Sequence, residues 1–344
     1  MKTIEKRSQT NVNEKGITSM IPNILAMKKI LLILCCSVVG LQAVINVTPF
    51  HQIHVEGIVK DISLYGDTLL IGTDKGVLHI YDYEKQVFLK QITLPKVKDF
   101  MGDEIDARVF SVDQTDGRYL LLSTAGKGGY SNLWIHEDNV TKELIFPEDK
   151  KAVIKARFVD KEYILLGYLS NEAVLFNTVS QKELYKVQLS PSKFSDFALN
   201  EHKTKAVFSC ESGVLSVIDV QTGKLLHILK GQNVDNVYKV DYKNGIISAA
   251  GQDRRGALYD VALGQGTYIE GSFLIYATAL SPSAKKVAFA MDEKNNISIY
   301  NRSTKQKLVE LQGQKSTLNT IIFKDENTLF SSSDDSTVMM WKIK

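Results

Sequence analysis

The sequence predicts an all-β protein, a seven-bladed β-propeller with four antiparallel strands in each blade. Two observations support this fold class. Short segments with alternating apolar residues run through most of the chain and are separated by turns rich in Gly, Asp and Asn, as in antiparallel sheets. One of these segments recurs at intervals close to 41 residues, and a repeat of about 40 to 45 residues is typical of propeller blades.

The recurring segment is the third strand of each predicted blade. Its seven copies read GVLHIYD, NLWIHE, AVLFNT, GVLSVID, GALYDV, NISIYN and TVMMWK. The equivalent residues in these copies are Tyr81, His136, Phe176, Ile218, Tyr259, Tyr300 and Trp341, and the spacings between them are 55, 40, 42, 41, 41 and 41 residues. Intervals this regular predict seven copies of one structural unit.

Whole units can be followed in the sequence as well. The first unit shows four strands in the segments IVKDISLYG, TLLIGTD, GVLHIYD and VFLKQITLP. The fourth unit repeats this plan with KFSDFALN, KAVFSCES, GVLSVIDV and KLLHILKG. No segment after residue 43 needs to be a helix, so residues 44–344 are expected to form a single propeller domain.

The seventh unit lacks a fourth strand, because the chain ends directly after its third strand. A spare segment, FHQIHVEG at residues 50–57, precedes the first complete strand of blade one. Pairing the two would remove two exposed sheet edges that could otherwise recruit other chains. We therefore predict that residues 50–57 form the outer strand of the last blade and close the ring.

The one long interval contains an insertion of about 14 residues between blades one and two. It falls between Pro95 and Ala107 and includes the sequence KVKDFMGDEIDAR, which mixes charges with Phe100, Met101 and Ile105. A connection from an outer strand to the next inner strand emerges on the same face as the turns between second and third strands. The insertion is therefore expected to rise above that face, the top rim.

Residues 1–43 have the pattern of an N-terminal extension and a secretory signal. Two lysines after Met27 are followed by the apolar run Ile30–Leu41 and then by the small residue Ala43, which is typical of a cleavage site. The run is too short for a spanning helix, which needs roughly 20 residues. Cys35 would suggest a lipid anchor, but bulky Leu34 stands where such signals have a small residue. We expect cleavage after Ala43 and export to the periplasm, with translation from Met27 left open.

The charge of the chain changes once this extension is set aside. Residues 1–43 hold six Lys or Arg and two Asp or Glu, which leaves 36 basic and 37 acidic residues. The concentrated basic surface that nucleic-acid binding needs is therefore not expected. Cys210 is the one cysteine that remains, so no intrachain disulfide is expected, and its apolar strand predicts a buried role.

The segment DDSTVMMW at residues 334–341 resembles the end of a WD40 repeat, Ser-x-Asp-x-Thr followed by alternating hydrophobic residues and a tryptophan. The resemblance covers residues 50–344 as architecture and implies the propeller fold. The sequence departs from the family in two ways. Only the last unit has the tryptophan, and Gly231-Gln232 and Gly313-Gln314 stand where the family has Gly-His. The family's Asp-His-Ser-Trp hydrogen-bonded tetrad is therefore assigned to no residue.

Export, a divergent seven-bladed body and the chain length together resemble the periplasmic WD40 accessory proteins of the NapL type, which accompany periplasmic nitrate reductase. This resemblance rests on overall pattern and has no diagnostic motif. It implies a protein partner among the components of that reductase, and a role in assembly or support of the enzyme without a cofactor of the accessory protein's own.

A search for catalytic or metal-binding groups favours none. His51 and His54 are three apart on a predicted strand, so they point to opposite faces and cannot share a metal. The Gly-rich stretch Gly126–Gly129 lacks the spacing and the following helix of a phosphate-binding loop, and we interpret it as a turn between strands. Trp341 is expected to be a packing residue, whereas packing and ligand stacking are equally compatible with Trp134.

The leading functional hypothesis is a monomeric, non-enzymatic scaffold that binds a protein partner through its top rim, with no cofactor, no metal and no membrane span. Binding residues concentrate in loops on rigid scaffolds. Two adjacent arginines in a predicted top turn suit carboxylate recognition, and a solvated turn with salt bridges to neighbours such as Asp253 is the favoured alternative for them. The candidate partner-binding residues are Lys96, Lys98, Phe100, Met101, Asp103, Glu104, Arg108, Arg254 and Arg255. Two alternatives stay open: an enzyme or small-ligand binder that uses the central channel, and an outer-membrane assembly scaffold.

Overall fold

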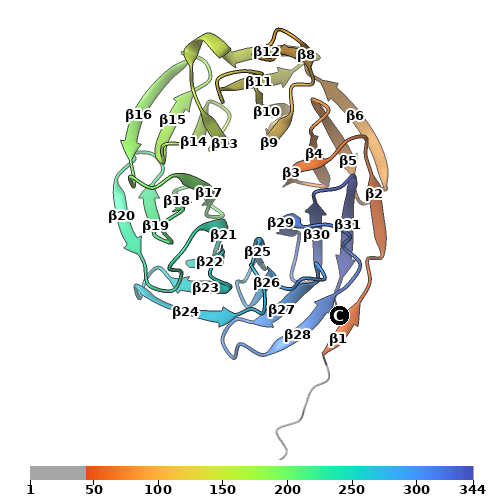
Figure 1. Ribbon diagram of the computed structural model, residues 1–344, viewed down its shortest axis with the longest axis vertical. Coiled ribbons are helices and arrows are strands. Elements are labelled where there is room, and N and C mark those ends of the chain that lie inside the picture. Colours follow the sequence, from red (N-terminus) through yellow and green to blue (C-terminus); the bar gives the residue numbers. More distant parts are fainter. Residues whose placement is uncertain (1–43, 344) are drawn as a thin grey trace, which may run out of the picture. The chain divides into compact units, whose positions relative to one another are not determined.

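The computed structural model describes residues 44–343, and Figure 1 shows these residues as a ring of blades. Seven sheets of four antiparallel strands form the blades, so the predicted seven-bladed propeller is confirmed. The helical exception within residues 44–343 is a short 3-10 turn, η1 (Pro147–Asp149), where the sequence predicted no helical segment. None of the helical structure described there is long or apolar enough to cross a membrane.

The strands follow one another from the channel outward in every blade. Blade one contains β3 (Val59–Tyr65), β4 (Thr68–Thr73), β5 (Val77–Asp82) and β6 (Val87–Thr93), and blade two contains β9 (Val109–Thr115), β10 (Arg118–Thr124), β11 (Ser131–Glu137) and β12 (Val140–Ile145). Blade three contains β13 (Val153–Phe158), β14 (Tyr163–Tyr168), β15 (Glu172–Asn177) and β16 (Lys182–Gln188), and blade four contains β17 (Phe194–Leu199), β18 (Lys205–Cys210), β19 (Leu215–Asp219) and β20 (Leu225–Leu229).

The remaining blades follow the same plan. Blade five contains β21 (Val237–Lys243), β22 (Ile246–Gly251), β23 (Arg255–Asp260) and β24 (Gln265–Glu270), and blade six contains β25 (Ala277–Leu280), β26 (Lys286–Ala290), β27 (Ile297–Asn301) and β28 (Lys307–Leu311). Blade seven contains β29 (Leu318–Phe323), β30 (Thr328–Ser333), β31 (Thr337–Lys342) and β2 (His51–His54).

The burial of each strand follows from its place in the blade. All six residues of β5 are buried, and so are five of the six residues of β4, because the second and third strands are covered by the neighbouring blades on both faces. The outer strand β6 is instead mostly exposed. A strand that is buried on both faces has to be apolar nearly throughout, which explains why the third strands gave the clearest repeat in the sequence.

The ring is closed by the strand that the sequence predicted. Strand β2 pairs antiparallel with β31, with His51 opposite Met340 and Ile53 opposite Val338. Ile53 is buried, whereas the paired strand is shorter than the predicted segment 50–57. The outer strand of blade seven therefore comes from the opposite end of the propeller domain, and residues from both ends share one sheet.

A further strand at the outer edge was not predicted. Strand β1 (Ile45–Val47) lies parallel to β28 and makes blade six a five-stranded sheet. The Gln312 N–H donates to the Val47 carbonyl at 2.8 Å and extends this contact. Residues 45–54 thus run along the outer edges of blades six and seven, and they cover backbone groups that would otherwise be open for pairing.

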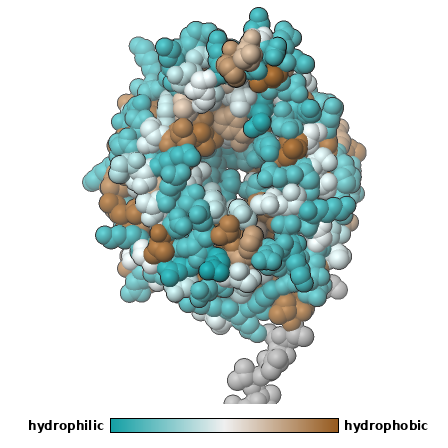
Figure 2. Space-filling model, viewed as in Figure 1, coloured by the Kyte–Doolittle hydropathy of each residue, from teal (hydrophilic) through white to brown (hydrophobic). Residues whose placement is uncertain are grey.

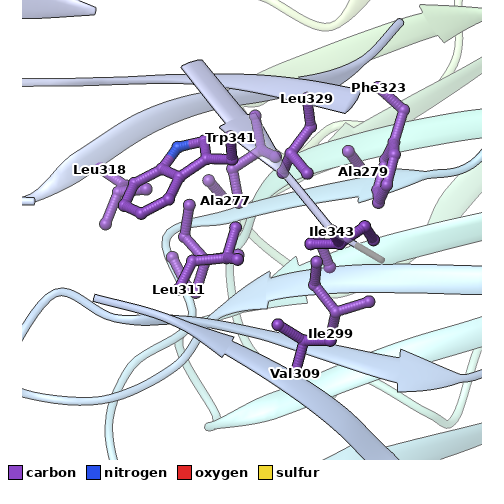
Figure 3. Packing of buried hydrophobic residues seen from close by; sticks show 14 of the residues in the cluster. Ala277, Ala279, Ile299, Val309, Leu311, Leu318, Phe323, Leu329, Trp341 and Ile343 are labelled. Carbon is purple, nitrogen blue, oxygen red and sulfur yellow. The ribbon is translucent and has the colours of Figure 1, made fainter. Parts of the chain in front are cut away.

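Trp341 is a packing residue at the interface of blades six and seven. Figure 3 shows its indole ring among Leu318, Leu311 and Ala277, and it is 0% exposed. Its Nε1–H donates to the Ser331 hydroxyl at 2.8 Å, so the polar edge of the ring is satisfied inside the protein. The expected packing role of Trp341 is confirmed.

The hydrogen bond of Trp341 begins a chain of polar contacts. The Ser331 hydroxyl donates to Gln314 Oε1 at 2.8 Å, and Gln314 Nε2 donates to the Ser333 hydroxyl at 2.6 Å. Ser333 in turn donates to the Asp335 carboxylate at 2.9 Å. Gln314 therefore connects Trp341 and Ser331 to the turn aspartate, at the position where a WD40 repeat would have histidine. No residue of the sequence was predicted to take part in such a network.

Neighbouring blades are joined at the channel by aspartate side chains. Four aspartates on inner strands each accept a backbone N–H from the inner strand of the next blade. The pairs are Asp61 with Val112 (2.9 Å), Asp113 with Phe158 (2.8 Å), Asp196 with Val240 (3.1 Å) and Asp241 with Leu280 (2.8 Å). Hydrogen bonds to a charged acceptor are stronger than neutral ones, so these contacts help to fix the angle between blades.

Removal of the Trp341 side chain tests the packing between blades six and seven. Trp341→Ala should lower the free energy of unfolding by about 3 to 5 kcal/mol, because it leaves a cavity in a closed interface. Trp341→Phe keeps much of the ring volume and should cost less. Urea denaturation of the full chain measures both variants, and a change within about 0.5 kcal/mol for Trp341→Ala would be typical of an exposed residue and would contradict the observed burial.

Candidate interaction surface and central channel

The insertion between blades one and two forms a small hairpin on the top rim. Its strands are β7 (Val97–Lys98) and β8 (Glu104–Ile105), which pair antiparallel. Gly76, in the turn between β4 and β5, packs against the backbone of Ala107 just after the hairpin. The hairpin therefore lies next to a turn between a second and a third strand, as the sequence predicted.

The tip of the hairpin is held in shape by Asp99. Its carboxylate accepts the N–H groups of Met101 at 2.8 Å and Asp103 at 3.0 Å, and its own N–H donates to the Asp103 carbonyl. Gly102 has a φ of +95°, which supports the tight return of the chain. The turn displays Phe100 and Met101, whose exposed fractions are 83% and 71%. Two large apolar side chains are thus held in solvent on an ordered turn.

The base of the hairpin is docked onto blade two. Val97 packs against a buried cluster that includes Leu121 and Trp134. The carbonyl oxygen of Lys98 lies so close to Gly126 that a Cβ added to Gly126 would be 2.3 Å from it, and Gly126 also has a φ of +84°. The turn Gly126–Gly129 precedes strand β11, as the sequence predicted, whereas its contact with the hairpin was not predicted.

Charged residues surround the exposed tip. Asp106 lies 3.6 Å from Lys75 Nζ and 4.0 Å from Lys96 Nζ, so Lys96 shares an ion pair at the base of the hairpin. Lys98, Asp103, Glu104 and Arg108 are exposed. Residues 96–106 contain four carboxylates and two lysines, which gives the hairpin a net negative charge.

The two candidate arginines belong to a different part of the ring. Arg255 is the first residue of β23 in blade five and Arg254 directly precedes it, and β23 lies across the ring from β8 in Figure 1. Arg255 donates to the Gln232 carbonyl at 3.2 Å and stacks on the Tyr268 ring at 4.5 Å, so it is engaged within blade five. Arg254 is exposed. The structure groups residues 96–108 in one surface and does not bring the arginines to it.

The structure also shows the surroundings of four other residues that the sequence singled out, namely Trp134, His51, His54 and Cys210. Trp134 is buried and donates to the Ser123 hydroxyl at 3.0 Å, which favours packing over ligand stacking. His51 Nε2 lies 2.9 Å from the Tyr81 hydroxyl, whereas His54 contacts Thr337. Cys210 is buried and free. Within residues 44–343, no three His, Cys, Asp or Glu side chains lie together as a metal site would require.

The central channel is a hollow lined by the inner strands of the propeller. Figure 2 shows its opening at the centre of the ring, and its cavity has a volume of ≈ 520 Å³ with inner strands of all seven blades in its lining. Four ion pairs of the described residues lie in this lining, and two of them are within hydrogen-bond distance. Arg157 Nη2 is 2.9 Å from Asp61, and Lys155 Nζ is 2.6 Å from Asp196. The channel wall is therefore charged.

Burial and charged partners act in opposite directions on the pKa values of Lys155 and Asp196. Burial by itself would raise the pKa of Asp196, but Lys155, Lys239 and the Val240 N–H hold this pKa below its ordinary value. Burial lowers the pKa of Lys155 to about 8, against the opposing effect of Asp196. Both groups are therefore charged at neutral pH. The contacts that aspartates make between inner strands have a signal in the sequence. Asp recurs in the inner-strand segments VKDIS, SVDQ, FSDF and KVDY.

The ring, the order of its blades and its closure define the class of this protein, which is a seven-bladed β-propeller. Beyond the fold, the comparisons add no family: no protein-family model matches the chain, and no curated protein matches it either.

Gly126→Ala tests the seating of the hairpin. The new Cβ would meet the Lys98 carbonyl and strain the backbone, so the hairpin should detach from blade two while the blades stay folded. Trypsin should then cleave faster after Lys98. Gly129→Ala is the matched control, since its φ of +67° is also positive but no atom lies within 4 Å of the added Cβ. Equal cleavage rates in the two variants would show that the contact with Lys98 does not hold the hairpin.

The Lys155–Asp196 pair can be tested by a double-mutant cycle. Asp196→Ala leaves Lys155 buried without its partner and should lower the free energy of unfolding by about 3 to 5 kcal/mol. Adding Lys155→Met should recover much of this loss, because the buried charge is then gone. Chemical denaturation measures all four proteins at pH 7. Strictly additive losses would contradict a direct interaction between the two side chains.

Proposed function

We propose that this protein is a non-enzymatic interaction scaffold and that the β7–β8 hairpin contacts its protein partner. The observation that carries the proposal is the exposure of Phe100 and Met101 on a turn fixed by Asp99. Exposed apolar side chains on an ordered, docked loop lose little conformational freedom on binding, and aromatic residues are common binding hot spots. A propeller ring supplies the rigid base that such a loop needs.

The chemistry of the hairpin indicates what the partner surface offers. Phe100 and Met101 suit an apolar pocket, because their side chains are large and lie next to each other. The carboxylates of Asp103 and Glu104 are exposed beside them and favour basic residues at the border of that pocket. Lys98 and Arg108 contribute positive charge at the base of the hairpin, where a smaller acidic contact is expected.

The cellular setting of the proposal comes from the sequence. Residues 1–43 lie outside the described residues, and the export signal predicted there from the sequence pattern supports a location in the periplasm. The resemblance to NapL-type accessory proteins supports components of periplasmic nitrate reductase as the partner, with a role in assembly or support of that enzyme. We propose a monomer that holds no cofactor itself, and an outer-membrane assembly complex is the alternative partner.

Capture experiments with the full chain test the contact surface. Phe100→Ser combined with Met101→Ser should weaken capture of the native partner by about thirtyfold, since two hot-spot side chains are removed. The hairpin backbone and the stability of the protein should change little, because both side chains are exposed. Deletion of Lys96–Asp106 should give the same loss in a folded protein.

The matched control is Val179→Ser combined with Leu263→Ser, because these side chains are 72% and 67% exposed on other blades. Partners are captured from a periplasmic extract and identified by mass spectrometry, with binding measured on the purified pair. Undiminished capture by both the hairpin double variant and the deletion would refute the proposed surface.

A further inference from the structure

The central channel contains charged groups that the scaffold role does not use. The lining of its cavity includes the turns that join first and second strands, such as Tyr65–Gly66 and Asn200–Glu201. The β7–β8 hairpin contacts the turns at the other end of the second strands, around Gly76 and Gly126. The channel mouth at Asn200–Glu201 and the hairpin are therefore at opposite faces of the ring, and a ligand in the channel would not need the hairpin.

The negative charges in this lining are already stabilised by groups of the protein itself. Five carboxylates line the cavity, and each accepts at least one backbone N–H. Asp61 and Asp196 also pair with Arg157 and Lys155. The N–H contacts of the five are Asp61 with Val112, Asp113 with Phe158, Asp196 with Val240, Asp241 with Leu280, and Glu201 with Asn244.

Three lysines on one wall of the cavity have positive charges that are balanced much less by neighbouring carboxylates. Lys203 lies in the turn after β17, and Lys239 and Lys243 lie on β21 of the next blade. Lys239 Nζ is 4.0 Å from Asp196, and Lys243 Nζ is 3.9 Å from Asp241, so both pairs exceed hydrogen-bond length. The Lys203 ammonium group has no ion pair within residues 44–343. These lysines leave several N–H donors free on adjoining elements of blades four and five.

One buried polar atom of another blade in the same lining has no hydrogen-bond partner within residues 44–343. The hydroxyl of Thr320, on β29 of blade seven, belongs to the lining of the same cavity. Its oxygen is buried and has no hydrogen-bond partner among the described residues. Because buried polar groups in proteins nearly always have a partner, this hydroxyl is an unsatisfied group in the wall of the cavity.

We propose that the channel binds a small anion that carries two or more carboxylate or phosphate groups, held by Lys203, Lys239 and Lys243. Three cations on two neighbouring blades match several negative groups better than one, and lysine serves carboxylate and phosphate alike. A volume of ≈ 520 Å³ is within the range of small-molecule sites. The ion pairs Arg157–Asp61 and Lys155–Asp196 form the charged wall beside the ligand and stay in place when it binds.

Calorimetric titration of the full chain tests the site. Citrate and pyrophosphate, each at constant ionic strength, distinguish carboxylate from phosphate as the bound chemistry, and acetate is the monovalent control. We expect at least one of the two probes to bind with a dissociation constant below about 1 mM, and acetate to bind far more weakly. The triple variant Lys203→Gln, Lys239→Gln and Lys243→Gln should weaken binding at least about tenfold, because it removes the charged donors.

A triple variant with the same change in charge controls for general attraction. Lys182→Gln, Lys224→Gln and Lys230→Gln replace exposed lysines of blades three and four that do not line the cavity, and they should leave binding unchanged. The single variant Lys203→Gln lies at a turn and should weaken binding without loss of fold. It therefore tests the site even if the triple variant does not fold. Equal weakening in both triple variants, or no binding of either probe at about 10 mM, would overturn the proposal.

Discussion

The structure depends on the antiparallel pairing of β2 with β31. Each blade of a propeller is held by its two neighbours, so the ring has to be completed by a contact between the two ends of the domain. Strand β2 makes this contact in blade seven, and the chain then continues directly into β3 of blade one. The side chain of Ile53 is buried in the cluster shared by blades seven and one, together with Tyr81 and Phe330. A closed ring follows, and the inner strands are kept close to one another.

Closure also determines the chemistry at the centre of the ring. When inner strands are held side by side, an aspartate on one strand reaches the backbone N–H of the next, as Asp61 reaches Val112 and Asp196 reaches Val240. Carboxylates used in this way are not available to bind a cation from solution. The lysines at the wall formed by blades four and five are then left as the accessible charge of the channel. The top rim differs in chemistry, because its hairpin presents apolar side chains bordered by carboxylates.

The hydrogen-bond chain of Trp341 shows how the fold persists where the repeat signature does not. Gln314 accepts from Ser331 through its carbonyl oxygen and donates to Ser333 through its amide nitrogen. A side-chain amide has both a donor and an acceptor, as a neutral imidazole does, so it can bridge the same kind of partners. Blade two keeps a related contact, in which Trp134 donates to Ser123. The described residues therefore form these hydrogen bonds within a seven-bladed propeller, although no family model matches the chain.

The sequence by itself determined the number of blades, the identity of the third strands and the closure of the ring by residues near His51. These features depend on local alternation and on constant spacing, which are visible along the chain because every blade has to bury the same strands. It also located the insertion with Phe100 and Met101. Only the tertiary structure decided that β1 joins blade six, that Gly126 seats the hairpin, that Arg254 lies across the ring from it, and that Lys203 and Lys239 share a cavity. Such contacts join residues far apart in sequence, and they arise from ring geometry that no local pattern encodes.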